Sequence, residues 1–131
     1  MKILVVDDEI EIQNSLRESL ERAGYQVVTA EDGMKAVEMA HAEMPDLILL
    51  DLLLPALDGF RVLRLLKSDE RYQKIPILVI TAKADAEDWA LAEECGADVC
   101  MAKPVRPDDL LETIAHWLGR GKGAKVDAGR C

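Results

Sequence analysis

Three features that would define other classes of protein are absent from this 131-residue sequence. No apolar run approaches the ~20 residues that a membrane-spanning helix needs, so we expect no membrane segment. The amino terminus leads directly into an apolar strand, and we therefore expect no signal peptide. Cysteine is scarce, and its odd number, 3, without metal-type spacing favours a reducing, cytoplasmic environment over a disulfide framework.

Positive charge is also scarce, and it is unevenly distributed. Residues 1–118 contain 12 Lys and Arg against 24 Asp and Glu, whereas residues 119–131 contain 4 against 1. Binding to nucleic acid requires a positive surface, so the acidic body argues against direct nucleic-acid binding and suits a cation or basic partner surfaces. The segment 119–131 is rich in glycine and has no apolar period. We interpret it as a flexible tail, or the start of a linker, after a single domain formed by residues 1–118.

The chain does contain a fivefold alternation of short apolar runs and amphipathic segments. The amphipathic segments have apolar residues at helical spacing, and Gly24, Pro45 and Gly96 are stop signals for helices. In the second of these helices we expect Met34, Val37 and Ala40 to face the core. Strands alternating with helices predict a flavodoxin-like, doubly wound α/β sandwich with five parallel strands in the order 2-1-3-4-5. The apolar runs that predict the strands are residues 3–6, 26–30, 47–50, 77–80 and 99–102.

Four of the predicted strands are followed at their carboxyl ends by residues that can carry chemistry. The carboxyl ends of the strands in an open parallel sheet lie along one edge, where ligands bind at the topological switch point. Each residue has an ordinary explanation by itself, because strand ends are wet and Asp forms turns. Four strands with such groups at the same end indicate a functional site. The residues are, in chain order, Asp7 with Asp8, Asp51, Thr81 and Lys103.

The three acids at this edge predict a cation site. Carboxylates that lie within a few ångströms of one another either take up protons or bind a cation. A set of oxygen ligands without His or thiolate selects a hard ion, and Mg²⁺ fits best. Beside such an ion, Asp51 can attack phosphorus as a carboxylate nucleophile and form an acyl phosphate. Lys103 and the Thr81 hydroxyl would then stabilise the charge that develops on the phosphoryl oxygens.

At this point the sequence resembles the receiver domains of bacterial two-component response regulators, of the CheY-like type. The resemblance implies a signalling phosphoacceptor, not a separate enzyme, that receives its phosphoryl group from a sensor histidine kinase or a histidine phosphotransfer protein. It implies control of a downstream protein or output domain in the cytoplasm, and it leaves open a phosphorylation-dependent homodimer. The resemblance covers residues 2–118 and rests on motifs in a specific order: Ile3–Asp8, Asp51–Pro55, Asp58-Gly59, Ile80–Ala82, Gly96–Asp98 and Lys103-Pro104.

The resemblance also assigns the acids their roles. Asp51 would be the phosphoacceptor. Asp8, Asp51 and the backbone carbonyl of Leu53 would bind Mg²⁺, for which Mn²⁺ could substitute, and Asp7 would act mostly through a metal-bound water. Leu53 departs from the family in placing an apolar side chain at the mouth of the site.

The resemblance bears on five further positions. Thr81 would form a hydrogen bond to the phosphoryl group, and Lys103 would pair with it. A cis peptide bond between Lys103 and Pro104 would aim the ammonium inward, since cis costs only ~0.5–1 kcal/mol before proline. Ala82 is small and would leave the site open to a phosphodonor. Cys100 occupies a position where the family usually has Tyr or Phe, which puts the usual aromatic output switch in doubt.

Three alternative classes share part of this pattern. A flavin-binding protein would have the same sheet order, but it needs a Ser/Thr/Gly-rich phosphate loop where this chain has the acidic segment 7–9. An aspartyl-phosphate phosphatase usually has a second acid two residues after its strand-end Asp, where this chain has Leu53. A receiver-like domain that signals by binding alone is disfavoured by the complete set of acids, Thr and Lys.

Overall fold

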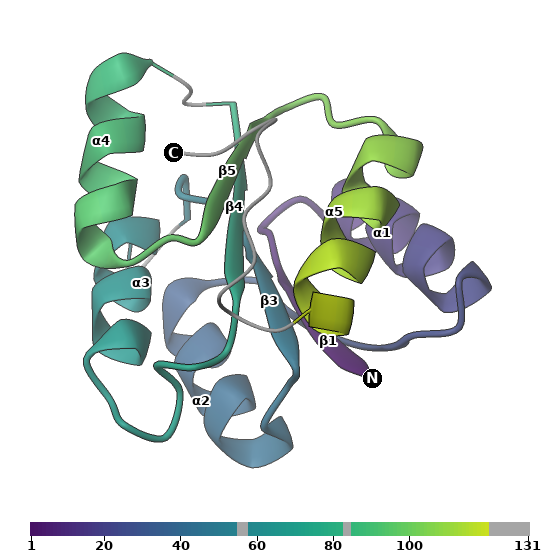
Figure 1. The fold of residues 1–131 in the computed structure, drawn as a ribbon, viewed down its shortest axis with the longest axis horizontal. Helices are drawn as coiled ribbons and strands as arrows, with labels where there is room; N and C mark the ends of the chain where they lie inside the picture. The colour runs from purple at the N-terminus through teal and green to yellow at the C-terminus, as the bar shows by residue number, and fades with distance from the viewer. Residues whose placement is uncertain (55–57, 83–84, 121–131) are drawn as a thin grey trace.

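The computed structural model describes residues 1–54, 58–82 and 85–120. Within them the strands form one parallel sheet of five strands in the order β2-β1-β3-β4-β5. The predicted topology is therefore confirmed, and Figure 1 shows the sheet running between two layers of helices. The strands are β1 (Lys2–Val6), β2 (Gln26–Ala30), β3 (Leu47–Leu50), β4 (Ile77–Thr81) and β5 (Val99–Ala102).

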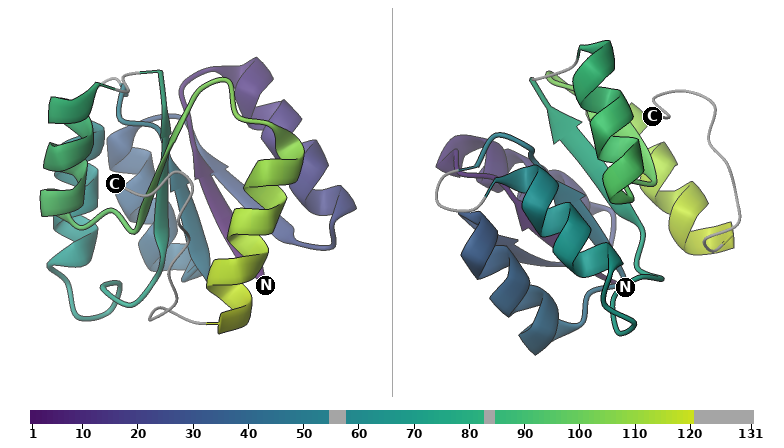
Figure 2. Two further views of the ribbon diagram at one scale, coloured as in Figure 1. Left: turned by 45° about the horizontal axis from the view of Figure 1, so that its top comes forward. Right: turned by 90° about the vertical axis from the view of Figure 1, so that its left-hand side faces the viewer.

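The helices divide between the two faces of the sheet. As Figures 1 and 2 show, α1 and α5 cover one face, and α2, α3 and α4 cover the other. The helices are α1 (Ile10–Arg22), α2 (Gly33–Glu43), α3 (Gly59–Lys67), α4 (Ala86–Cys95) and α5 (Pro107–Arg120).

The central strand β3 shows why the strands are continuously apolar. Its side chains point alternately to the two faces, so that Leu47 and Leu49 pack under α1 and α5, while Ile48 and Leu50 pack under the other three helices. All four residues are at most 1% exposed. Helices on both faces remove the polar, solvent-facing positions that a half-buried strand would have.

Aspartates begin three of the helices, and glycines end two of them. The side chains of Asp32, Asp58 and Asp85 each accept a hydrogen bond from the main-chain N–H three residues further on, at the start of α2, α3 and α4. These bonds satisfy N–H groups that have no partner inside the helix. Gly24 and Gly96 follow α1 and α4 with φ angles of 98° and 112°, which favour glycine.

The inward face of α2 differs from the sequence prediction. Met34 is 63% exposed, so the expectation that it faces the core is wrong. Ala40 is buried and Val37 is half-buried against the core, as predicted. Gly33 and Ala36 are buried as well, and Ala36 and Ala40 lie four residues apart on one side of the helix. These two small side chains allow α2 to approach the sheet closely, and the apolar character of Met34 is not a guide to its direction.

The carboxyl-terminal helix is longer than predicted. It ends at Arg120, two residues beyond the predicted domain boundary. The rest of the predicted tail, residues 121–131, and Pro55 lie outside the described residues. Among the helices that the structure describes, none is long and apolar enough to cross a bilayer. Cys95 is a free and buried cysteine.

Candidate functional site

Asp51 directly follows β3 and is held at the carboxyl end of that strand. Its main-chain N–H donates to the Val6 carbonyl at 3.0 Å, which extends the pairing of β3 with β1 by one residue. Its side-chain Oδ1 accepts a hydrogen bond from the N–H of Leu53 at 2.9 Å. Only 5% of the residue is exposed. The carboxylate therefore occupies a confined place in which an unpaired charge would be costly.

Gly59, at the start of α3, is in close contact with the backbone beside Asp51. Its N–H donates to the Leu52 carbonyl at 3.1 Å. A Cβ atom at this position would lie 2.4 Å from the Leu52 Cα and 2.7 Å from the Asp51 carbonyl oxygen. Only glycine fits without a backbone shift, and the contact fixes the chain that leaves Asp51.

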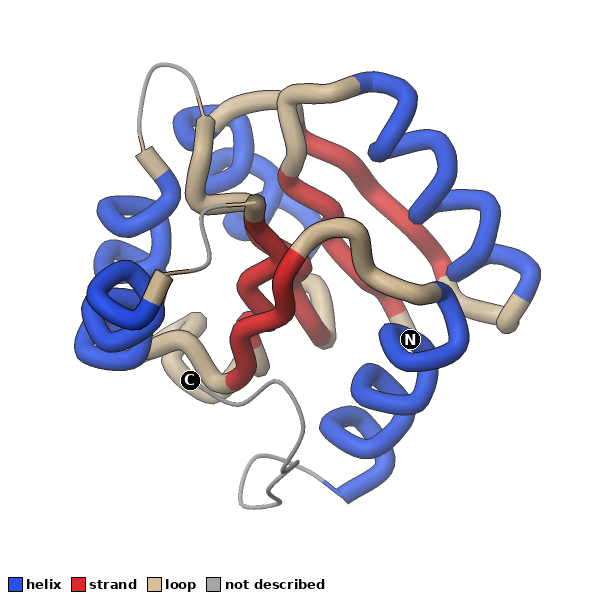
Figure 3. The backbone as a smooth tube through the Cα atoms, turned by 90° about the horizontal axis from the view of Figure 1, so that it is seen from above, coloured by secondary structure: helices blue, strands red, loops and turns tan. Residues whose placement is uncertain are grey.

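Asp7 and Asp8 extend β1 toward Asp51. Asp7 is 2% exposed, and its Oδ1 accepts a hydrogen bond from the N–H of Glu9 at 2.9 Å. Asp8 is exposed. Each of Asp7, Asp8 and Asp51 offers one carboxylate oxygen, and these atoms all lie within 4.8 Å of one another. Three converging carboxylate oxygens, one of them open to solvent, fit a hard divalent cation. Figure 3, seen from above, looks onto this end of the sheet.

Lys103 joins the two buried acids. Its Nζ lies 2.8 Å from Asp7 Oδ2 and 2.7 Å from Asp51 Oδ2, and 3.9 Å from Glu9 Oε1. The peptide bond to Pro104 is cis, as the resemblance implies. The side chain thus crosses from the end of β5 to the ends of β1 and β3, and it is 14% exposed.

The pKa of Lys103 reflects two opposing effects. Burial of the ammonium lowers its pKa, because a charged group is poorly solvated there. Hydrogen bonds to Asp51 and then Asp7, with the attraction of both carboxylates, outweigh burial, so that the pKa lies above the ordinary value for lysine. Lys103 is therefore a positively charged counter-ion of the acid cluster at neutral pH.

The remaining predicted residues lie in or shortly after strands β3, β4 and β5. Thr81 ends β4 and is fully buried, and its carbonyl accepts a hydrogen bond from the N–H of Lys103 at 3.0 Å. Ala82 is exposed, as a residue at an open entrance would be. Leu53 is 48% exposed and so presents an apolar side chain to solvent. Cys100 is fully buried on β5, opposite Val79 of β4.

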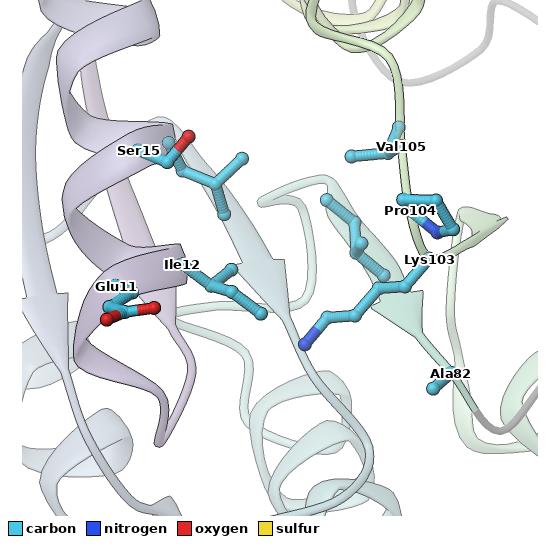
Figure 4. Close-up of a pocket in the computed structure, with 9 residues that line it drawn as sticks. Glu11, Ile12, Ser15, Ala82, Lys103, Pro104 and Val105 are labelled. Carbon is cyan, nitrogen blue, oxygen red and sulfur yellow. The ribbon is translucent and has the colours of Figure 1, made fainter.

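A cavity of about 550 Å³ opens beside Lys103. Figure 4 shows Ile12 of α1 on one side of it and Lys103 and Val105 on the other. The sequence gives no signal for this cavity, because its lining comes from segments far apart in the chain. Its lining residues are Glu11, Ile12, Ser15, Leu16, Ile80, Ala82, Lys103, Pro104 and Val105.

Sequence reasoning also misses Gln13, which is one of the few buried polar residues. It belongs to α1 and is 6% exposed. Its side-chain amide donates hydrogen bonds to the main-chain carbonyls of Asp7 and Ala30. Its proximity to the acid cluster depends on the packing of α1 against β1 and β2, which no local sequence pattern reveals.

The fold and the site together define a flavodoxin-like α/β domain with an acid cluster bridged by lysine. Residues 3–115 match the response regulator receiver domain, and the chain belongs to this family. It is thus a receiver domain of two-component response regulators, a family that works with histidine kinases or phosphotransfer proteins and with output domains.

Individual proteins support the same assignment. The chain is 50% identical over 123 residues to the alkaline phosphatase synthesis transcriptional regulatory protein PhoP of Bacillus subtilis, covering 92% of this chain and 50% of that protein. The chain therefore spans about half the length of this relative. The chemotaxis protein CheY4 of Vibrio cholerae superposes with a TM-score of 0.82 at 34% identity, covering 86% of this chain and 94% of that chain.

A third relative bears on the metal. The receiver domain of the sensor histidine kinase PA1611 from Pseudomonas aeruginosa superposes with a TM-score of 0.84 at 32% identity, covering 90% of this chain and 97% of that chain. That structure holds a magnesium ion in its active-site cleft. Receiver domains generally bind Mg²⁺, and the acid cluster of this chain is compatible with it.

Proposed function

We propose that this receiver domain catalyses transfer of a phosphoryl group to Asp51 in a Mg²⁺-dependent reaction. The observation that carries the proposal is the surroundings of the Asp51 carboxylate. It is buried, paired with Lys103 at 2.7 Å, and clustered with two further carboxylates within 4.8 Å. A nucleophile, a cationic group and a cation site therefore meet at one sheet edge, as phosphoryl transfer requires.

Asp8, Asp51 and the Leu53 carbonyl are the residues proposed to hold the metal, with Asp7 acting through a bound water. Mg²⁺ would neutralise the acids and draw charge from the phosphoryl oxygens, and Mn²⁺ could substitute for it. Asp8 is exposed whereas Asp7 and Asp51 are buried, so the cation would enter from the side of Asp8.

The reaction is an exchange of one bond to phosphorus for another. A carboxylate oxygen of Asp51 forms a bond to phosphorus, and the bond between phosphorus and the donor's histidine nitrogen breaks, leaving its electron pair on that nitrogen. The Lys103 ammonium, which pairs with Asp51 beforehand, would turn toward a phosphoryl oxygen. The Thr81 hydroxyl would donate to another, and Ala82 would leave room for the donor.

The phosphorylated domain would control an output domain or a downstream protein in the cytoplasm. Relatives of about twice this length are transcriptional regulators. We therefore propose that residues 1–118 are the receiver domain and that residues 119–131 are a tail or the start of a linker. Helix α5 includes residues 119 and 120. Phosphorylation-dependent pairing of two copies belongs to the same proposal, and no direct nucleic-acid binding is assigned to this chain.

Intact-mass analysis after incubation with acetyl phosphate tests the reaction. The wild type should gain one phosphoryl group with Mg²⁺ and none with a chelator present. Asp51→Asn should gain none. Asp32→Asn is the matched control, because Asp32 is a half-buried helix cap outside the acid cluster and Asn also caps helices. Phosphorylation of the Asp51→Asn protein at the wild-type rate would refute the assignment.

A further inference from the structure

Gln13 is the buried polar side chain that connects α1 with the acid cluster. Its Nε2 donates to the Asp7 carbonyl and, at 3.0 Å, to the Ala30 carbonyl. Both hydrogens of one amide are thus used on two main-chain oxygens at the carboxyl ends of β1 and β2. A glutamine that is 6% exposed and forms hydrogen bonds to two strand ends can fix the position of the backbone there.

We propose that Gln13 is a positioning residue of the metal and phosphoacceptor site, which it serves through Asp7. This inference rests on the proposed function of that site. Gln13 would not touch the metal or the phosphoryl group. It would fix the backbone of Asp7 so that the carboxylate of Asp7 stays aimed at Lys103 and at the cation site.

The position of Asp7 in the sheet explains why such support is needed. The pairing of β1 with β2 ends at Val6 and Ala30. Beyond it, the Asp7 N–H still donates to the Ala30 carbonyl at 3.1 Å, while the chain turns to begin α1 at Ile10. The Gln13 amide contacts the carbonyls on both sides of this last bond. It therefore continues the attachment of β1 to its neighbour where the regular ladder stops.

Asp7 also provides contacts within the acid cluster. One carboxylate oxygen of Asp7 accepts from Glu9 N–H at 2.9 Å, and the other pairs with Lys103 at 2.8 Å. Rotation of the Asp7 backbone would change the direction of both oxygens. Residues that orient metal-site residues by hydrogen bonding typically contribute about 10–100-fold to metal affinity or activity.

An alternative role for Gln13 is to supply hydrogen bonds to two buried carbonyls and nothing more. The two roles differ in their effect on stability and on Mg²⁺ affinity. A role in satisfying carbonyls predicts lower stability and unchanged Mg²⁺ affinity. A positioning role predicts that Mg²⁺ affinity falls in a protein that remains folded. Gln13→Met separates them, because methionine has similar length and volume and cannot donate a hydrogen bond.

The experiment measures Mg²⁺ affinity by titration calorimetry and melting temperature without metal. Thr113→Val is the matched control, since Thr113 is also 6% exposed and its hydroxyl also donates to a main-chain carbonyl, that of Asp109 in α5. We expect Gln13→Met to weaken Mg²⁺ binding about tenfold. Thr113→Val should lower the melting temperature and leave the affinity within about twofold of the wild type. If Gln13→Met does not fold, Gln13→Asn, whose amide is one methylene too short to reach both carbonyls, takes its place.

The outcomes distinguish this inference from the proposed function. A wild-type protein that binds Mg²⁺, with a Gln13→Met affinity within about twofold of it, would overturn the positioning role and leave the proposed function standing. Equal losses of affinity in Gln13→Met and Thr113→Val would also overturn it, because general destabilisation would then explain both. A wild type that binds no Mg²⁺ would count against the proposed function itself.

Discussion

The ammonium of Lys103 lies 2.7 Å from Asp51 Oδ2, so the proposed phosphoacceptor is ion-paired with a lysine. The same ammonium lies 2.8 Å from Asp7 Oδ2. Lys103 therefore offsets the repulsion between two buried carboxylates before any metal or phosphodonor arrives. It also competes with a metal for them, and this competition leads to the first prediction.

Lys103→Met should destabilise the metal-free protein and strengthen its response to Mg²⁺. Removing one partner of a buried ion pair leaves uncompensated charge, which we expect to cost about 1–3 kcal/mol where water reaches part of the site. Urea unfolding with and without Mg²⁺ measures both effects. The increase in unfolding free energy on adding Mg²⁺ should be larger in the variant. An increase equal to or smaller than that of the wild type would show that Lys103 does not compete with the cation.

The raised pKa of Lys103 predicts a loss of stability in alkaline solution. The folded state holds this proton more tightly than the unfolded state does, and the pKa of an unperturbed lysine is about 10.4. The pair's contribution should be fully present below that pH and should disappear as pH rises through the higher folded-state pKa. Unfolding free energies of wild type and Lys103→Met, compared above and below about pH 10.4, should converge at the alkaline end. A constant difference would contradict the raised pKa.

Asp8→Ala should weaken Mg²⁺ binding strongly without destabilising the metal-free fold. Asp8 is the exposed member of the acid cluster, so its removal relieves repulsion without breaking a buried contact. We expect the rise in melting temperature on adding Mg²⁺ to be nearly abolished. Glu70→Ala gives a control for the loss of an exposed acid outside the cluster. An undiminished Mg²⁺ shift in Asp8→Ala would exclude Asp8 as a ligand.

Leu53→Asn should shorten the lifetime of the acyl phosphate. Hydrolysis needs a water in line with the bond between Asp51 and phosphorus, and the half-exposed Leu53 side chain cannot hold one by hydrogen bonding. Asparagine can. Decay of radiolabelled phosphoprotein after removal of the donor measures the rate, with Leu65→Asn as the control because Leu65 is a similarly exposed leucine in α3. Equal or slower decay in Leu53→Asn would count against this role.

Gly59→Ala should impair both stability and phosphorylation. Its Cβ would lie 2.4 Å from the Leu52 Cα, so the backbone beside Asp51 must move. We expect a loss of about 1–3 kcal/mol in unfolding free energy, typical of overpacking, and slower labelling with acetyl phosphate. Gly119→Ala is the control, since nothing lies within 4 Å of a Cβ there and alanine favours a helix by about 0.5–1 kcal/mol. Unchanged labelling in Gly59→Ala would show that the backbone near Asp51 tolerates displacement.

The sequence is sufficient to predict the order of strands in the sheet and the residues that lie at the carboxyl ends of those strands. Parallel strands that are buried on both faces have continuously apolar sequences. The residue after each apolar run must therefore lie at the edge of the sheet formed by the carboxyl ends of the strands. The placement of Asp7 and Asp51 follows from that rule alone. The direction of Met34 does not follow, because an apolar side chain near the start of a helix can lie off its buried stripe.

Contacts that depend on side-chain reach could not be predicted in the same way. The pairing of one Lys103 ammonium with two carboxylates depends on how far apart β1, β3 and the end of β5 lie. Gln13 occupies a buried helical position that a hydrophobic pattern would assign to an apolar residue, so periodicity hides its role. Both become visible only when distant segments are placed together.

Three aspartates that cap helices affect how the negative charge of this protein should be counted. Asp32, Asp58 and Asp85 lie at amino-terminal ends of helices, where main-chain N–H groups and the helix dipole carry partial positive charge. Their negative charge is thereby partly neutralised within the fold. The formal net charge of −9 counts these three carboxylates in full. It therefore overstates the electric field that a cation in solution meets near them. Attraction for a divalent ion is strongest where several carboxylates converge, as those of Asp7, Asp8 and Asp51 do.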